Sequence, residues 1–212
     1  MTPVPQVVPA ELRLMMQTAP PAEPDDRQLV ETIRNGDSDA FETLVRRKTS
    51  KVYALCYRVI GNAEDARDIA QLVFLKLWEN LGKYDPQFAF DTWLYRMVTN
   101  VAIDFMRNRQ SRENAVNSSL RLVRTSADAE QGLEVQRKEV ENVFNEISTT
   151  LSPKQKTIFV MSQMEDLPSS EIAKILGCRE STVRNHLFNA RKVMQQQLRQ
   201  RYPEYAQLWR NR

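Results

Sequence analysis

The most informative spacing lies in residues 170–192, where the side chains suit base recognition rather than catalysis. Ala173, Gly177 and Val183 are separated by four and then six positions. This is the pattern of a helix-turn-helix: the small residue lets two helices cross closely, glycine makes the tight turn, and valine anchors the second helix. The spacing therefore predicts a helix over residues 181–201 that enters the major groove of duplex DNA.

The outward face of that helix carries the candidate duplex-binding side chains. Leu187, Ala190 and Met194 continue its inner face, which leaves arginine, asparagine and lysine pointing outward. Arginine can bond guanine, asparagine can bond adenine, and Arg191 and Lys192 can neutralise phosphates. The alternative is a helical hairpin of another all-α protein. The candidates are Ser181, Thr182, Arg184, Asn185, Phe188, Asn189, Arg191 and Lys192.

A predicted helix over residues 90–108 carries a second stripe that could bind nucleic acid. Guanidinium groups pair with phosphates, aromatic faces stack on unpaired bases, and amides bond exposed base edges, so this mixture favours a single strand. Alternatively, the tryptophan lies at the edge of the core and the arginines are solvated. The stripe consists of Trp93, Arg96, Asn100, Ile103 and Arg107, and the core stripe of Phe90, Leu94, Met97, Val98, Val101 and Phe105.

Large apolar residues also lie off the core face of a predicted helix over residues 63–81. Leu72, Leu75 and Trp78 are interleaved with acidic and amide groups. An exposed apolar patch of this kind is typical of a site that binds another protein. The alternative is a helix buried on two sides within its own domain. The core face consists of Ala66, Ile69, Ala70, Val73, Leu77 and Leu81.

The composition favours helices and argues against several other classes. Of 212 residues, 42% are apolar and 27% charged, and only 5 are glycine, which disfavours hairpins and glycine-rich phosphate loops. Two cysteines and one histidine indicate no metal site or disulfide framework. Cys56 and Cys178 are predicted to be buried, and His186 to lie at a helix surface. Without a long apolar run or a secretory signal, a cytoplasmic protein with no membrane insertion is expected.

The charge is distributed unevenly, although the net charge is only +3. Residues 1–26 hold one arginine against four acidic residues, whereas residues 177–212 hold eight lysines or arginines against two acidic residues. A basic C-terminal segment indicates a polyanionic partner such as nucleic acid, although solvated basic helix faces are also common.

The pattern as a whole predicts an all-α protein with two small helical domains joined by a flexible linker. The domains span residues 27–109 and 134–201, and the second contains the helix-turn-helix. A proline-rich leader, residues 1–26, precedes them, the polar linker covers residues 110–133, and residues 202–212 form a tail. Other predicted helices are one that ends at Ile60, an amphipathic one from Val135 to Ile147, and those over residues 154–163 and 170–176.

Three motifs, in this order, resemble those of the extracytoplasmic-function (ECF) sigma factors, the small two-domain class of bacterial RNA polymerase specificity subunits. Residues 65–78 resemble the family's polymerase-clamp-binding segment, and residues 90–109 its segment that recognises the minus-10 element and opens the strands. Residues 167–198 resemble its minus-35 helix-turn-helix, and the likeness as a whole covers residues 27–200.

The resemblance implies a non-enzymatic initiation factor without catalytic residues, metal or cofactor. Its partners would be core RNA polymerase, through the beta-prime clamp and the beta flap, promoter DNA, and an anti-sigma factor. It would act in the cytoplasm, at the nucleoid when in holoenzyme, in a stress response. Asn100 and the loop from Tyr84 to Phe90 would hold a flipped non-template base, and the linker would thread toward the polymerase active-site channel.

The same likeness implies two further sets of site residues. Core polymerase would be bound by Asp65, Asp68, Ile69, Gln71, Leu72, Phe74, Leu75 and Trp78. The minus-10 strand would be bound by Tyr84, Phe90, Trp93, Arg96, Asn100, Ile103, Arg107 and Arg109. The sequence departs from the family in two places: Leu72 stands where a glutamate is common, which makes the patch more apolar, and the proline-rich leader is longer than in most members.

A repressor-like regulator is the main alternative, with residues 27–110 as a dimerisation or ligand-binding domain. Such a protein would bind promoter DNA tightly without core polymerase. An enzyme such as a helical hydrolase is a third class, but the only histidine lies in the predicted DNA-binding helix and no nucleophile or carboxylate pair is recognisable.

Overall fold

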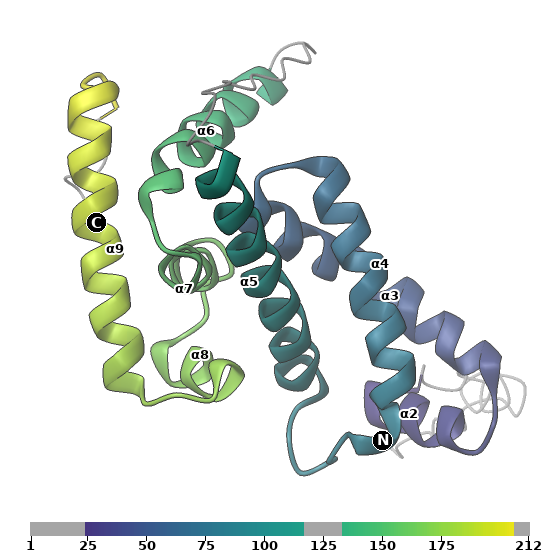
Figure 1. Ribbon diagram of the computed structural model, residues 1–212. Helices are drawn as coiled ribbons and strands as arrows, with labels where there is room; N and C mark the ends of the chain where they lie inside the picture. The colour runs from purple at the N-terminus through teal and green to yellow at the C-terminus, as the bar shows by residue number, and fades with distance from the viewer. Residues whose placement is uncertain (1–23, 117–132, 206–212) are drawn as a thin grey trace, which may run out of the picture. The chain divides into compact units, whose positions relative to one another are not determined.

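The computed structural model describes residues 24–116 and 133–205, with side chains for residues 24–113 and 139–205. Within these ranges it contains helices and turns but no strand, which confirms the all-α prediction (Figure 1). None of the described helices combines the length and apolar character needed to cross a membrane. The α-helices are α2 Asp26–Arg34, α3 Ser38–Ile60, α4 Ala63–Asn80, α5 Phe90–Val116, α6 Leu133–Ile147, α7 Pro153–Gln163, α8 Ser169–Leu176 and α9 Glu180–Arg201, and the 3-10 helices are η1 Leu81–Lys83 and η2 Ser148–Thr150.

Local capping signals set the ends of the first helices. The Asp25 side chain accepts a hydrogen bond from the Gln28 N–H, and the Gln28 side chain accepts one from the Asp25 N–H, so a capping box begins α2. Gly61 follows α3 with a φ of +81°. The Asn62 side chain then caps α4 by accepting a hydrogen bond from the Asp65 N–H at 2.9 Å. The boundary predicted at Gly61 and Asn62 is confirmed.

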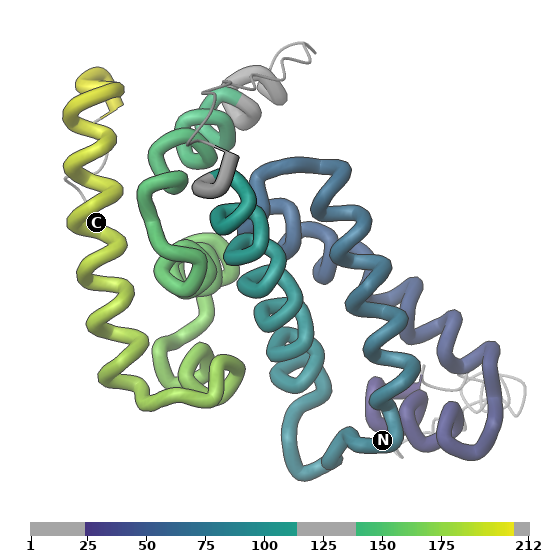
Figure 2. Tube along the Cα trace, viewed as in Figure 1, coloured from purple at the N-terminus to yellow at the C-terminus, as the bar shows by residue number. Residues whose placement is uncertain are grey.

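α4 and α5 lie side by side (Figure 2). Every residue predicted for the core face of α4 is buried, because apolar side chains spaced by three and four positions fall on one side of a helix. α3 contributes a similar apolar stripe. The buried side chains of α3 after residue 45 and of the first half of α5 include Val52, Leu55, Cys56, Val59, Ile60, Phe90, Leu94, Val98 and Ala102.

α5 is longer than the sequence predicts. The expected end at residue 108 is corrected, because α5 continues to Val116, so residues 110–116 of the expected linker are helical. α6 begins at Leu133. Residues 109–116 contain no glycine or proline to end the helix. In addition, Arg109 pairs with Glu113 one turn later at 3.6 Å, which supports a helix.

The predicted flexible segments fall mostly outside the described residues. These segments are the leader up to residue 23, residues 117–132 of the linker and residues 206–212 of the tail. The leader was expected to reach residue 26, but α2 already begins at Asp26.

The helix-turn-helix forms as its spacing predicts. Gly177 ends α8 with a φ of +61°, a left-handed conformation that favours glycine. The N–H of Cys178 donates to the Ala173 carbonyl at 3.0 Å, which closes the turn between α8 and α9. α9 packs against α7 and α8. Upstream, Ser152 caps α7 with Pro153 in the first turn, as predicted.

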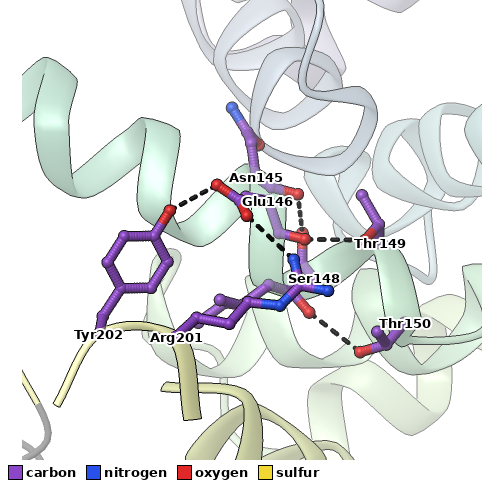
Figure 3. Close-up of polar contacts among 8 residues, drawn as sticks. Asn145, Glu146, Ser148, Thr149, Thr150, Arg201 and Tyr202 are labelled. Atoms are coloured by element: carbon purple, nitrogen blue, oxygen red, sulfur yellow. Dashed lines mark hydrogen bonds and ion pairs between the residues drawn. The ribbon is translucent and has the colours of Figure 1, made fainter. Parts of the chain in front are cut away.

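Polar contacts attach the end of α9 to α6 (Figure 3). The Glu146 carboxylate accepts a hydrogen bond from the Tyr202 hydroxyl and pairs with Arg201 at 2.9 Å. The Tyr202 bond is the largest of the causes that lower the pKa of Glu146. Beyond it, the Tyr205 hydroxyl donates to Glu139 at 2.6 Å. These contacts fix the C-terminal end of the helix whose N-terminal half carries the duplex-binding candidates.

Candidate functional site

α9 presents one buried and one exposed face. Val183, Leu187, Ala190 and Met194 are buried, as predicted for its inner face. On the opposite face only Thr182 is partly buried, and the other candidates are exposed. A row of hydrogen-bonding groups is therefore available to a DNA groove. The exposed candidates are Ser181, Arg184, Asn185, Phe188, Asn189, Arg191 and Lys192.

Two residues on this face stand out. The Arg184 guanidinium pairs with Glu180, one turn earlier, at 2.6 Å. Because both side chains are well exposed, the pair contributes little to stability but restricts where the guanidinium lies. Phe188 is 69% exposed, so an apolar ring stands among polar groups. Major-groove thymine methyls are the usual target of such a ring.

His186 lies at the edge of the same face and is partly buried, in keeping with its predicted place at the helix surface. Burial and the neighbouring Lys154 ammonium lower the pKa of His186 below its ordinary value of 6.5. The shift favours the neutral imidazole. Among the residues that the structure describes, no cluster of metal-binding side chains includes it.

The outward face of α4 is exposed. Leu72, Leu75 and Trp78 are 42%, 62% and 53% exposed, which excludes the alternative of a helix buried on two sides. Asp68 and Gln71 are exposed beside them. This face is a mixed apolar and acidic patch.

Three residues of the predicted polymerase-binding set are less accessible than expected. Ile69 is only 3% exposed and belongs to the core face of α4, so its prediction as a surface contact is wrong. Phe74 and Asp65 are partly buried. Asp65 also pairs with Arg109 of α5 at 3.7 Å, because the first turn of α4 lies beside the later part of α5. Two residues predicted for different sites are thus in contact.

A groove of about 600 Å³ lies between α4 and α5. Its presence corrects the predicted core stripe of α5: Met97, Val101 and Phe105 are half-buried groove residues, because α4 covers this face of α5 only in part. The groove combines apolar, amide and basic groups. It is lined by Ile69, Leu72, Lys76, Asn80 and Lys83, and by Trp93, Met97, Asn100, Val101, Asp104, Phe105 and Asn108.

The predicted single-strand stripe of α5 forms only in part. Arg96, Asn100 and Arg107 are exposed, and Trp93 is half-buried at the groove. Ile103, however, is 7% exposed, so its prediction as an outward residue is wrong. Ile103 is buried together with Thr99, Ala102 and Met106. The buried part of α5 is therefore wider than the predicted core stripe, because the helix is covered on more than one side.

Tyr84 and Phe90 form an aromatic cluster rather than an exposed pair. Each is 3% exposed, and their ring centres are 5.4 Å apart in an edge-to-face contact. Trp93 completes the cluster, with its ring 5.3 Å from that of Tyr84. The burial of Phe90 confirms its place in the predicted core stripe of α5, whereas its ring and that of Tyr84 are not exposed for the minus-10 contact that the family likeness implies.

Phe88 is 60% exposed in the loop before α5. It lies within the loop expected to hold a base but is not one of the individually predicted site residues. Its position in the sequence could have identified it: an aromatic residue in a short polar loop belongs to no helix face and is therefore expected to be exposed. The Tyr84 hydroxyl donates to the Phe88 carbonyl at 2.7 Å. The exposed ring of this loop is thus Phe88, supported by the buried Tyr84.

The two cysteines differ in burial. Cys56 is fully buried, as predicted, and burial raises the pKa of its thiol to about 12, which makes it unreactive. Cys178 is partly exposed, so the prediction of a buried residue is wrong. It stands in the turn between α8 and α9, where no helix face covers it completely.

Family models assign both groups of helices to one class of protein. Residues 44–112 match the model of sigma-70 region 2, and residues 144–194 match that of sigma-70 region 4. In addition, the chain is 31% identical over 180 residues to the ECF RNA polymerase sigma factor SigW of Bacillus subtilis, covering 82% of this chain and 96% of that protein. The chain belongs to the ECF sigma factor family.

Solved structures share the fold. The structure of CnrH in complex with the cytosolic domain of CnrY matches with a TM-score of 0.59 and 21% identity over 83% of this chain and 98% of CnrH. The sigma factor RpoE of Bartonella quintana, in complex with the anti-sigma factor NepR, matches with a TM-score of 0.56 and 17% identity over 75% of this chain and 96% of that one.

Membership of this family establishes the general function. The protein is an RNA polymerase sigma factor that directs transcription initiation, and the family is non-enzymatic. The all-helical structure and the two sigma domains agree with the predicted fold class. The repressor-like and hydrolase alternatives are thereby excluded.

Proposed function

We propose that this sigma factor recognises a promoter with two separate surfaces. The exposed face of α9 binds the duplex minus-35 element, and the exposed residues of α5, with the loop before it, bind the unpaired minus-10 strand. The observation that carries the proposal is the contrast between a regular polar helix face and a groove with amide, basic and aromatic groups. Double-stranded and single-stranded DNA require these two kinds of surface.

In the duplex complex, Arg184, Asn185 and Asn189 lie toward base edges, and Arg191 and Lys192 toward phosphates. Support comes from their exposure on the same side of α9. Arginine and asparagine discriminate bases by paired hydrogen bonds, whereas lysine and arginine on the flank set the register on the backbone.

In the open complex, Asn100 contacts an unpaired base while Arg96 and Arg107 hold the strand. Asn100 is exposed and also lines the α4–α5 groove beside Trp93. An amide beside an aromatic ring offers an unpaired base both a hydrogen-bonding edge and a flat apolar surface.

The outward face of α4 binds the beta-prime clamp of core polymerase through Leu72, Leu75 and Trp78. Three large exposed apolar side chains on one helix support this assignment, because an exposed apolar patch is typical of a protein-binding surface. The region 4 helices contact the beta flap. With these partners, we expect the protein to act in the cytoplasm, at the nucleoid when in holoenzyme.

An anti-sigma factor is proposed as a further partner. Its support is that the similar Bartonella quintana sigma factor was solved with the anti-sigma factor NepR. Such a partner would hold the protein inactive until a stress signal releases it.

The test is transcription in vitro with core RNA polymerase on a library of genomic fragments. We expect initiation at a set of promoters that share elements near minus-35 and minus-10, with unpaired bases detected by permanganate only at the latter. Initiation that depends on just one of the two elements would contradict the division into two surfaces.

A further inference from the structure

The loop after α7 is bound by a helix of the other sigma region. The Arg58 guanidinium of α3 pairs with the Glu165 carboxylate and donates to the Met164 carbonyl at 3.4 Å. Met164 follows the last turn of α7, which has no basic residue of its own. Arg58 therefore supplies the cation that the negative end of this helix favours. The Arg58 and Glu165 side chains are 33% and 16% exposed, so solvent screens the pair less than an ordinary surface ion pair.

The turn of the helix-turn-helix also contacts region 2. α5 packs against α7 and α8. The Arg96 guanidinium of α5 lies against Gly177, and a side-chain carbon added at position 177 would collide with it. The missing side chain of this glycine therefore admits an arginine of region 2. Because Arg96 is one of the residues proposed to hold the minus-10 strand, the turn takes up space that the strand requires.

Two further observations extend this interface. At the end of α3, a side-chain carbon added to Gly61 would lie only 2.8 Å from the side-chain oxygen of Asn145 in α6. Tyr95 of α5 is partly buried. Burial raises the pKa of its hydroxyl to about 12, and the charge of the nearby Glu165 carboxylate adds to the shift. Helices α3 and α5 of region 2 thus meet α6, α7 and α8 of region 4 at several separate points.

The two proposed DNA surfaces cannot both be occupied in this conformation. The minus-35 and minus-10 elements are about 25 base pairs apart, which is about 85 Å of duplex. A duplex this short does not fold back, because the persistence length of DNA is about 150 base pairs. Arg96, however, lies against Gly177. A helix rises 1.5 Å per residue, so the duplex-binding candidates up to Lys192 lie within roughly 30 Å of Arg96. Promoter binding therefore requires that the two regions separate.

We propose that Arg58 and Glu165 form an autoinhibitory latch: their ion pair holds region 4 against region 2 in the free sigma factor, and core polymerase opens it by binding the two regions at separate places. The inference rests on the proposed function, because it requires two DNA-binding surfaces that act at a distance from each other. The latch lies within the chain and needs no anti-sigma factor. Its strength sets the fraction of open chains, and the apparent affinity for core polymerase scales with that fraction.

Charge reversal in the full chain tests the latch. Arg58→Glu and Glu165→Arg should each open the free protein, which small-angle X-ray scattering detects as a larger radius of gyration. Each should also tighten binding to core polymerase about fivefold, because more chains are open. The variant with both substitutions restores an ion pair of opposite polarity, so both quantities should return toward those of the original protein. Arg46→Glu makes the same charge change at an exposed position of α3 and should alter neither quantity.

The opposite change is to lock the latch. Arg58→Cys and Glu165→Cys, combined with Cys178→Ser, place two reactive thiols at the contact, because the remaining Cys56 is fully buried. A bismaleimide with a disulfide in its spacer joins the two thiols, and a reductant cuts the spacer. The joined protein should lose transcription from promoters that need both elements and regain it after reduction. Cys178→Ser alone, treated in the same way, is the control.

Specific outcomes would overturn the inference. If the single reversals leave the radius of gyration and polymerase binding unchanged, or if the double variant stays as open as the single ones, this ion pair is not a latch. If the joined protein initiates as well as the reduced one, the closed conformation does not inhibit. If transcription by the unaltered holoenzyme depends on only one promoter element, the proposed function is itself wrong, which separates the two failures.

Discussion

The two proposed DNA-binding surfaces are constructed differently. On α9, the candidate residues lie on one side of a single regular helix, opposite the buried Val183 and Ala190. On α5, they lie between a groove and a buried arc, and the loop that precedes the helix rests on the buried rings of Tyr84 and Phe90.

This difference follows from the ligands. Duplex DNA is a rigid partner that accepts a straight helix in its major groove, so a surface of uniform exposure is sufficient. An unpaired strand has to be held base by base, which requires recesses and aromatic faces, and these come from several segments packed together. The α5 surface should therefore be more sensitive to changes in the core than the α9 surface.

The largest effect that separates the two surfaces is expected for Leu77→Ala. Leu77 of α4 is fully buried, and truncation of such a residue costs about 2 to 5 kcal/mol of folding free energy. The groove between α4 and α5 should be lost, and binding of single-stranded DNA and of core polymerase should be lost with it. Binding of duplex DNA by α9 should persist. Chemical unfolding measures the loss of folding free energy, and titrations with single-stranded and duplex DNA measure binding by the two surfaces. Leu75→Ala, at a position 62% exposed, is the control that should leave unfolding nearly unchanged.

A second, smaller effect should appear on α9 alone. Arg184→Ala is expected to weaken duplex minus-35 binding by the holoenzyme by about 1 to 3 kcal/mol, the scale of one base-specific contact. Competition titrations with base-substituted duplexes provide the measurement. Arg199→Ala, near the far end of the helix, should retain the base preference. Unchanged affinity and preference for Arg184→Ala would mean that this arginine does not read a base.

Asn100→Ala should affect the other surface alone. Loss of one amide contact to an unpaired base is expected to slow strand opening or alter minus-10 selection, at a cost of roughly 1 kcal/mol. Permanganate reactivity of the minus-10 thymines in the holoenzyme complex reports the opening. A loss of polymerase binding without an opening defect would show that Asn100 belongs to the protein interface instead.

The smallest effect concerns pH and the α9 surface. Because the folded protein lowers the pKa of His186 below 6.5, the unfolded chain binds a proton more readily than the folded one. Stability should therefore be fully present above that value and decrease as the pH falls below it. Urea unfolding of the protein and of His186→Gln, at neutral and mildly acidic pH, measures this difference. An equal decrease in both proteins would assign the pH dependence to other groups.

The sequence predicted α9 more accurately than α5. The helices of this half of the chain depend on signals that act within a few residues and can be recognised along the chain. These are apolar residues spaced by three and four on α9, the left-handed Gly177 before it and the capped start of the neighbouring α7. On α5, Ile103 and Met97 were assigned to the wrong environments. Helical period alone gives the side on which a residue lies, but not how far a neighbouring helix extends over that side.

The sequence by itself determined the helices, most of their ends, the inner faces of α4 and α9 and the family of the protein, because each depends on local spacing, caps or contiguous motifs. Tertiary structure decided which residues around α5 are accessible. The burial of Tyr84 and Ile103, the exposure of Phe88 and the pairing of Lys48 with Asp91 all depend on segments distant in the chain. No pattern within one helix records what packs against it.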